Sequence, residues 1–166
     1  MNYFKDKNNK PFAFEDDVKE EVLNGFIEKF GLTSITETEF KALTAPSLDE
    51  LKTSKLSHIN TSCEAAIVGG FTSSALGSVH IYQSDRDDQI NLMGLVTAGA
   101  DDLLKCGVDD GNGNITWDWK QHTTAQLKAV FDDGALFKKQ QLIKANTLKA
   151  QVSAATTAEE LDGIVW

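Results

Sequence analysis

Apolar residues at the start of the chain form two short runs separated by a polar turn. Tyr3 and Phe4 precede Asn8-Asn9, and Phe12-Ala13-Phe14 follows. Asparagine tolerates the positive φ angles that tight hairpin turns demand. The pattern therefore predicts a β-hairpin.

The pattern then changes to a helical period. It predicts an amphipathic helix over residues 17–29, whose apolar side chains recur every four residues: Val18, Val22, Phe26 and Phe30. Thr36 and Glu39 have the spacing of a capping box for a second short helix over residues 37–43. Pro46 disfavours helical backbone angles at the residue before it, so this short helix should end there. We therefore predict a small module over residues 1–46 and a main domain over residues 47–166.

The main domain is predicted to open with a long helix over residues 48–68, which Ser47 and Glu50 cap. A second hairpin is predicted over 71–82, followed by a helix over 85–98 that Ser84 caps. We expect the buried stripe of that helix to consist of Ile90, Met93 and Val96.

A third hairpin is predicted over residues 103–120, around the turn-rich segment 109–114. Thr123 or Thr124 is expected to cap the next helix, which Asp132-Asp133-Gly134 should interrupt. A polar helix should then run over 135–153, with four apolar side chains among many Lys and Gln: Leu136, Ile143, Leu148 and Val152. Thr156 with Glu159 is expected to start a last short helix.

These elements define an α+β fold, with a hairpin-and-helix module followed by a domain of long helices with two β-hairpins. The long helices over 48–68 and 135–153 are only modestly apolar. They could pair with each other or with copies in a neighbouring chain, so a homo-oligomer stays open.

The net charge of the chain excludes some classes of binding partner. The 166 residues include 16 Lys and Arg against 25 Asp and Glu, which gives a net charge of −9 at pH 7. Such a chain repels phosphate backbones and anionic head groups, so we expect no nucleic acid and no membrane as partner. No apolar run approaches the ~20 residues that cross a bilayer. Two cysteines and no export-like segment predict free thiols and a bacterial host cytoplasm.

Candidate chemistry is sparse. Read as a calcium loop from Asp110, the turn has Ile115 where glycine belongs and Gln121 where glutamate belongs, which favours a plain turn over a weak cation site. The three histidines, His58, His80 and His122, are not spaced in the sequence as the ligands of a zinc ion are. Cys63 and Cys106 lie in apolar patterns typical of structural thiols. We therefore predict no catalytic residues, no metal, no cofactor and no enzymatic activity.

The tryptophans are the strongest candidates for partner contact. Trp117 and Trp119 fall on one face of a predicted strand, and Trp166 ends the sequence. Large aromatic side chains anchor cores and are also enriched at interfaces, so both interpretations stay open. We take Trp117, Trp119, Trp166 and Tyr82 as candidate partner-binding residues.

Several segments together carry a resemblance to a known group of proteins. They are the stretch from Ile59 to Tyr82, Asp88–Leu92, Trp117, His122-Thr123, Gln126–Lys128, Ala154–Leu161 and Ile164–Trp166. They resemble an uncharacterised domain common in tail genes of tailed bacteriophages. The opening hairpin and the segment from Gly31 to Pro46 are similar to the start of tail-fibre assembly proteins.

The resemblance implies a tail-fibre assembly chaperone that binds a fibre or adhesin protein in the host cytoplasm. It equally allows a permanent structural or receptor-binding component of the tail fibre or baseplate, kept in the virion. It carries over no catalytic residues. A small hydrolase is the third and least supported hypothesis, because no residues converge as an active site would.

Overall fold

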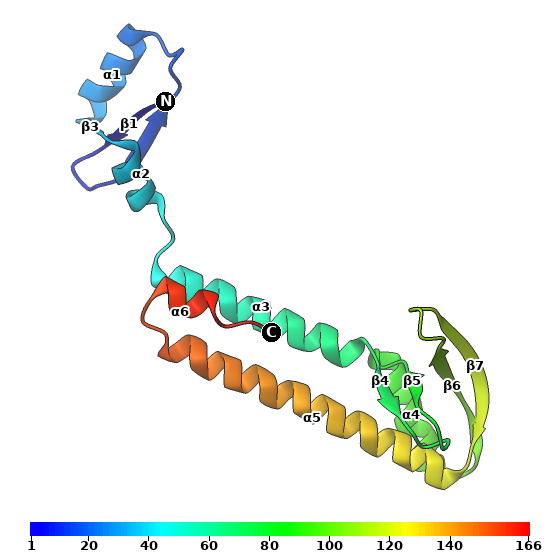
Figure 1. Cartoon of the computed structure of the whole chain (residues 1–166). Coiled ribbons are helices and arrows are strands. Elements are labelled where there is room, and N and C mark those ends of the chain that lie inside the picture. The colour runs from blue at the N-terminus through cyan, green and yellow to red at the C-terminus, as the bar shows by residue number, and fades with distance from the viewer. The chain divides into compact units, whose positions relative to one another are not determined.

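The computed structural model describes all 166 residues as two compact units, Met1–Ser47 and Leu48–Trp166. Each unit has its own sheet and its own helices (Figure 1). The chain is therefore a mixture of helix and sheet, an α+β protein.

The first unit is built on a three-stranded antiparallel sheet in the order β2-β1-β3: β1 (Asn2–Lys5), β2 (Pro11–Phe14) and β3 (Thr33–Ile35). The predicted hairpin is confirmed. Asn9 adopts a φ of 61°, and the Asp6 carboxylate accepts hydrogen bonds from the N–H groups of Asn8 and Lys10. The third strand was not predicted, because three residues carry too little alternation to identify one.

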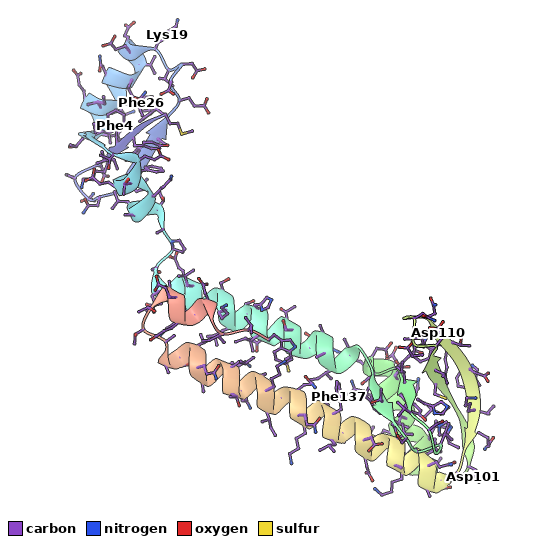
Figure 2. All side chains as sticks on the ribbon, in the orientation of Figure 1. Phe4, Lys19, Phe26, Asp101, Asp110 and Phe137 are labelled. Carbon is purple, nitrogen blue, oxygen red and sulfur yellow. The ribbon has the colours of Figure 1, made fainter.

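Two helices complete this unit, α1 (Glu20–Phe30) and α2 (Glu37–Thr44). The capping box at α2 is confirmed, since Thr36 Oγ1 accepts from the Glu39 N–H at 3.2 Å and Glu39 Oε2 accepts from the Thr36 N–H at 2.9 Å. The buried apolar side chains are Phe4 and Leu32. On α1, Phe26 (labelled in Figure 2) and Phe30 pack on rings of β2 but remain partly exposed.

The second unit contains two long helices that run side by side in opposite directions, α3 (Leu48–Val68) and α5 (Thr124–Ala154) (Figure 1). The short helix α6 (Ala158–Asp162) packs on α3. The core between them consists of small and aliphatic side chains: Ile59, Cys63, Ala145, Val152, Ala155, Leu161 and Ile164. The long helix predicted over residues 48–68 is confirmed, and it contributes Ile59 and Cys63 to this core.

The prediction of a break at Asp132-Asp133-Gly134 was wrong. Helix α5 is continuous over 31 residues. Lys128 forms an ion pair with Asp132 one turn along at 2.7 Å, which supports the helix there. Gly134 lies against the ring of Phe71, so a residue without a side chain is required by packing and does not mark an end.

The apolar side chains of α5 are buried to very different degrees. Leu136 and Ile143 are more than half exposed, whereas Leu127, Val130, Ala145 and Val152 are buried. The reason is that α5 contacts the sheet along one part of its length and α3 along another. A single stripe does not describe both contacts.

A four-stranded antiparallel sheet in the order β4-β5-β6-β7 forms the rest of the unit: β4 (Phe71–Ser73), β5 (His80–Tyr82), β6 (Asp102–Asp109) and β7 (Ile115–His122). Both hairpins predicted in this region are confirmed. The two hairpins join into one sheet where Ile81 of β5 pairs with Gly107 of β6.

Helix α4 (Arg86–Ala98) needs two corrections. Its cap is Asp85 and not Ser84, because Asp85 Oδ1 accepts from the Asp88 N–H at 2.8 Å. Ile90 and Met93 are 60% and 51% exposed, and Leu92 is the residue that enters the core. The last helix, α6, is likewise capped by Thr157 and not by Thr156.

Candidate protein-binding site

The hairpin of β6 and β7 presents an apolar outer face. Residues opposite one another include Lys105 with Trp119 and Gly107 with Trp117. Because side chains alternate between faces, Leu103, Ile115, Trp117 and Trp119 share one face, and Cys106 and His122 lie on the other. The second face packs into the core at Cys106 and His122, which are fully buried. The first face is the outer one.

Trp117 and Trp119 behave differently on this outer face. The ring of Trp117 lies over Gly107, where an added Cβ would meet its atoms at 3.1 and 3.2 Å. Lys105 Nζ stands 5.7 Å from the centre of the same ring. Trp119 has no such cover and is 61% exposed. Trp117 therefore stabilises the hairpin, and Trp119 is available to a partner.

Strand β7 is also the outermost strand of its sheet (Figure 1). The N–H of Asp110 donates to the Asn114 carbonyl at the end of the hairpin. Hydrogen-bonded pairs recur at every second residue of an antiparallel ladder. Even-numbered residues of β7 therefore bond to β6, and the N–H and C=O groups of Ile115, Trp117, Trp119 and Gln121 point to the open edge.

One of these edge groups is held by a side chain. The Trp119 N–H donates to Asp118 Oδ1 at 2.8 Å, and Asp118 Oδ2 lies 3.9 Å from Lys120 Nζ. The Asp118 carboxylate thus covers one donor of an otherwise open edge.

Tyr82 lies in the core and is not part of the candidate surface. It is 2% exposed, its ring stacks on Phe71, and its hydroxyl lies 2.9 Å from His122 Nε2. A partner could not reach this ring without opening the core, so the expectation that Tyr82 contributes a surface contact is wrong for this fold. The alternation around His80, Ile81 and Tyr82 gave no sign of which face would be buried.

Trp166 is placed apart from the other two tryptophans. It packs against the helical core around Ile164 and Leu161, and Lys144 Nζ lies 4.4 Å from the centre of its ring. Lys55 Nζ donates to the Ile164 carbonyl at 3.1 Å, which fixes the same segment. The structure therefore brings Trp117 and Trp119 together and leaves Trp166 in a separate, mainly structural position.

A cleft that sequence reasoning missed lies between α4 and α5. It has a volume of about 520 Å³, and its walls include Phe71, Leu92 and Phe131 together with the exposed side chains of Ile90 and Met93. Arg86 and Lys138 stand among the residues that line it. Helix α4 carries Ile90, Leu92, Met93, Leu95 and Val96, which are more apolar side chains than one buried stripe of a short helix holds, and this excess is the signal that could have indicated the surface.

Buried titratable groups occur in the core of the sheet, in an environment that suppresses their charged forms. Burial raises the pKa of the Tyr82 hydroxyl and of the Cys106 thiol, and it lowers the pKa of His122. The Lys120 carbonyl lies 2.8 Å from His122 Nδ1, which makes Nδ1–H the donor and leaves Nε2 to accept from Tyr82. A thiol held neutral at zero exposure is a poor nucleophile.

The turn between β6 and β7 uses its carboxylates internally. Asp110 accepts hydrogen bonds from the N–H groups of Asn112 and Asn114 and from the Asn114 side-chain amide, and Asn114 is the main cause of a lowered pKa at Asp110. Asp109 accepts from the Gly111 N–H. No group of three or more His, Cys, Asp or Glu side chains is arranged to hold a metal ion. None of the helices is both long and apolar enough to cross a bilayer.

Fold and site together define an α+β protein with an uncovered, tryptophan-bearing strand at the edge of one sheet. Residues 50–165 match the family described as "Domain of unknown function (DUF4376)", and the chain belongs to that family. The match falls within the second compact unit and leaves the first unit outside it. No curated protein and no solved structure matches the chain.

Proposed function

We propose that this protein is a non-enzymatic, protein-binding assembly factor of a tailed bacteriophage. In this proposal it acts as a chaperone for a tail-fibre or adhesin protein in the host cytoplasm. The phage context rests on the resemblance of Ile59–Tyr82 and the later segments to phage tail proteins. The binding role rests on the outer face of the β6–β7 hairpin.

The observation that supports binding most directly is the exposure of Trp119 on the sheet face that also carries Leu103, Trp117 and Ile115. Exposed aromatic and aliphatic side chains that adjoin one another are typical of protein contact surfaces. A net charge of −9 keeps a chain with such a surface dispersed and directs it away from nucleic acid.

A chaperone of this kind has physical value for fibre proteins. Their β-structure pairs residues far apart in sequence, so the chains fold slowly and expose apolar surface and open strands meanwhile. A partner with an apolar sheet face can cover that surface until the fibre chains reach their register.

The test is co-expression with the fibre protein encoded beside it, followed by affinity capture of the small protein and measurement of soluble fibre. We expect capture of the fibre and an increase in its soluble fraction. Trp119→Ser should weaken both, because it removes the most exposed aromatic side chain of the face. Leu136→Ser on α5, which removes a similarly exposed apolar side chain elsewhere, is the matched control and should change neither.

Mass spectrometry of purified particles separates the chaperone from the alternative role. Absence from particles together with a fibre that needs the protein for solubility supports the chaperone. A stoichiometric amount in particles would instead make it a structural or receptor-binding component of the tail fibre or baseplate. A fibre that neither binds the protein nor needs it would contradict both roles.

A further inference from the structure

The open edge of β7 has the geometry to pair with another strand. Its odd-numbered residues, from Ile115 to Gln121, direct their N–H and C=O groups away from β6. The edge is eight residues long and is not shortened by proline or a bulge. Long, regular edges of this kind pair readily with a further strand.

The side chains on the inner face of β7 determine which strand fits. Asp118 and Lys120 follow each other on this face, with side chains 68% and 39% exposed. In an antiparallel pair, residues directly opposite one another place their side chains on the same face, where like charges repel and opposite charges attract. A fitting strand must therefore place a cation opposite Asp118 and an anion opposite Lys120.

A second copy of β7 meets this requirement in one register. With Asp118 on the two-fold axis, two aspartates would face each other, and with Lys120 on the axis two lysines would. With Trp117 on the axis, Asp118 would face Thr116 and Lys120 would face Asn114. With Trp119 on the axis, each Asp118 faces Lys120 of the other copy, and the open N–H and C=O groups of both edges meet.

We propose that two copies of the chain associate through their β7 edges, antiparallel, with Trp119 on the two-fold axis. The two four-stranded sheets then form one continuous sheet. The Trp119 N–H leaves Asp118 Oδ1 and donates across the axis, while the freed carboxylate pairs with Lys120 of the second copy. The apolar outer faces of both copies become one surface.

Dimerisation through β7 requires only the strand edge and its charges and does not depend on binding to a fibre. The charges on the inner face of β7 have opposite effects in different registers of pairing. In mismatched registers they oppose pairing, as edge charges commonly do. In the matched register they select it, which gives one defined dimer instead of open-ended association.

The test measures the mass of the full chain by sedimentation equilibrium at fixed salt, without any fibre protein. We expect a dimer for the wild type. Asp118→Lys and Lys120→Asp should each weaken dimerisation by roughly tenfold or more, because each places like charges opposite one another twice. The double variant D118K/K120D restores opposite charges and should dimerise as the wild type does.

Mixing provides the sharpest readout. In a one-to-one mixture of D118K and K120D, one copy carries two lysines at these positions and the other carries two aspartates, so every pair across the axis is complementary. The mixture should form a heterodimer at a concentration at which each variant alone is mainly monomeric. Asp132→Lys and Lys128→Asp on α5 change the net charge by the same amounts at exposed positions and should leave the wild-type dimer intact.

Far-UV circular dichroism of each variant controls for folding. A monomeric wild type would overturn the proposal, and so would single variants that dimerise normally. Failure of the mixture and of the double variant to dimerise, with all chains folded, would also overturn it. Pairing with a fibre strand in place of a second copy would appear as a monomer that binds only the fibre.

Discussion

The hydroxyl of Tyr82 lies 2.9 Å from Nε2 of His122, and both side chains are buried beneath the sheet, at 2% and 0% exposure. Tyr82 lies on β5 and His122 ends β7, so the bond links two strands that do not pair directly. The bond also satisfies both polar groups in an environment that water does not reach.

Replacing Tyr82 with phenylalanine should destabilise the second unit by about 1–3 kcal/mol, because His122 Nε2 is then a buried acceptor without a donor. Urea unfolding followed by tryptophan fluorescence measures this, and all three tryptophans lie in the second unit. Tyr3→Phe in the first unit is the control and should leave that transition unchanged. An equal effect of both substitutions would contradict the assigned role of the bond.

Stability of the second unit should fall as the pH is lowered below about 6.5, the ordinary pKa of histidine. Burial lowers the pKa of His122 in the folded chain, so the unfolded chain takes up a proton in this window and the folded chain does not. The free energy of unfolding then decreases with decreasing pH, by at most about 1.4 kcal/mol per pH unit for one proton. Above this window the His122 contribution should not change with pH.

Urea titrations between pH 8 and pH 5.5 check this prediction. His122→Gln removes the titrating group, so the variant should be less stable at pH 8 yet show a shallower loss towards pH 5.5. The same slope in the variant and the wild type would assign the pH dependence to other groups.

Both cysteines should be nearly inert in the folded chain. Cys106 is fully buried with a raised thiol pKa, and Cys63 is buried with its Sγ 3.6 Å from the Gln141 carbonyl. Reaction with a chromogenic disulfide reagent should be roughly 100-fold slower in buffer than in denaturant. Rapid reaction of Cys106 in the folded chain would reopen the hypothesis of a nucleophilic enzyme.

Local signals in the sequence were sufficient where they act within a few residues. The hairpin around Asn8-Asn9 and the capping box of Thr36 with Glu39 depend on contacts made inside the turn or the first helical turn, and both were predicted. The α+β class follows from the sum of such segments.

Contacts between distant segments could not be predicted in this way. Ile90 and Met93 have helical spacing, but α5 packs beside Leu92, so two of the three residues predicted to be buried line a cleft instead. Tyr82 lies in a three-residue strand, whose alternation is too short to tell its buried face from its exposed one. Trp117 and Trp119 have equivalent positions in the strand. Only Trp117 lies opposite a glycine, so its ring packs over Gly107 while the ring of Trp119 stays exposed.

Gly134 shows the same conflict between local preference and packing, and it allows a matched experiment. An added Cβ at Gly134 would lie 2.7 and 2.9 Å from atoms of the Phe71 ring, which is stacked between Tyr82 and Phe137 and has little room to move. Gly134→Ala should therefore destabilise the second unit by about 1–3 kcal/mol, despite the better helix propensity of alanine.

Gly94 lies inside α4 with no atom within 4 Å of the position that its Cβ would occupy. Gly94→Ala should therefore stabilise the unit by about 0.5–1 kcal/mol, because the gain in helix propensity meets no steric opposition. Thermal unfolding followed by tryptophan fluorescence compares the two variants directly. Opposite signs would show that contact with Phe71 excludes a side chain at position 134. Stabilisation by both substitutions would instead mean that the ring of Phe71 can shift, and that Gly134 is not required by the packing of α5 on the sheet.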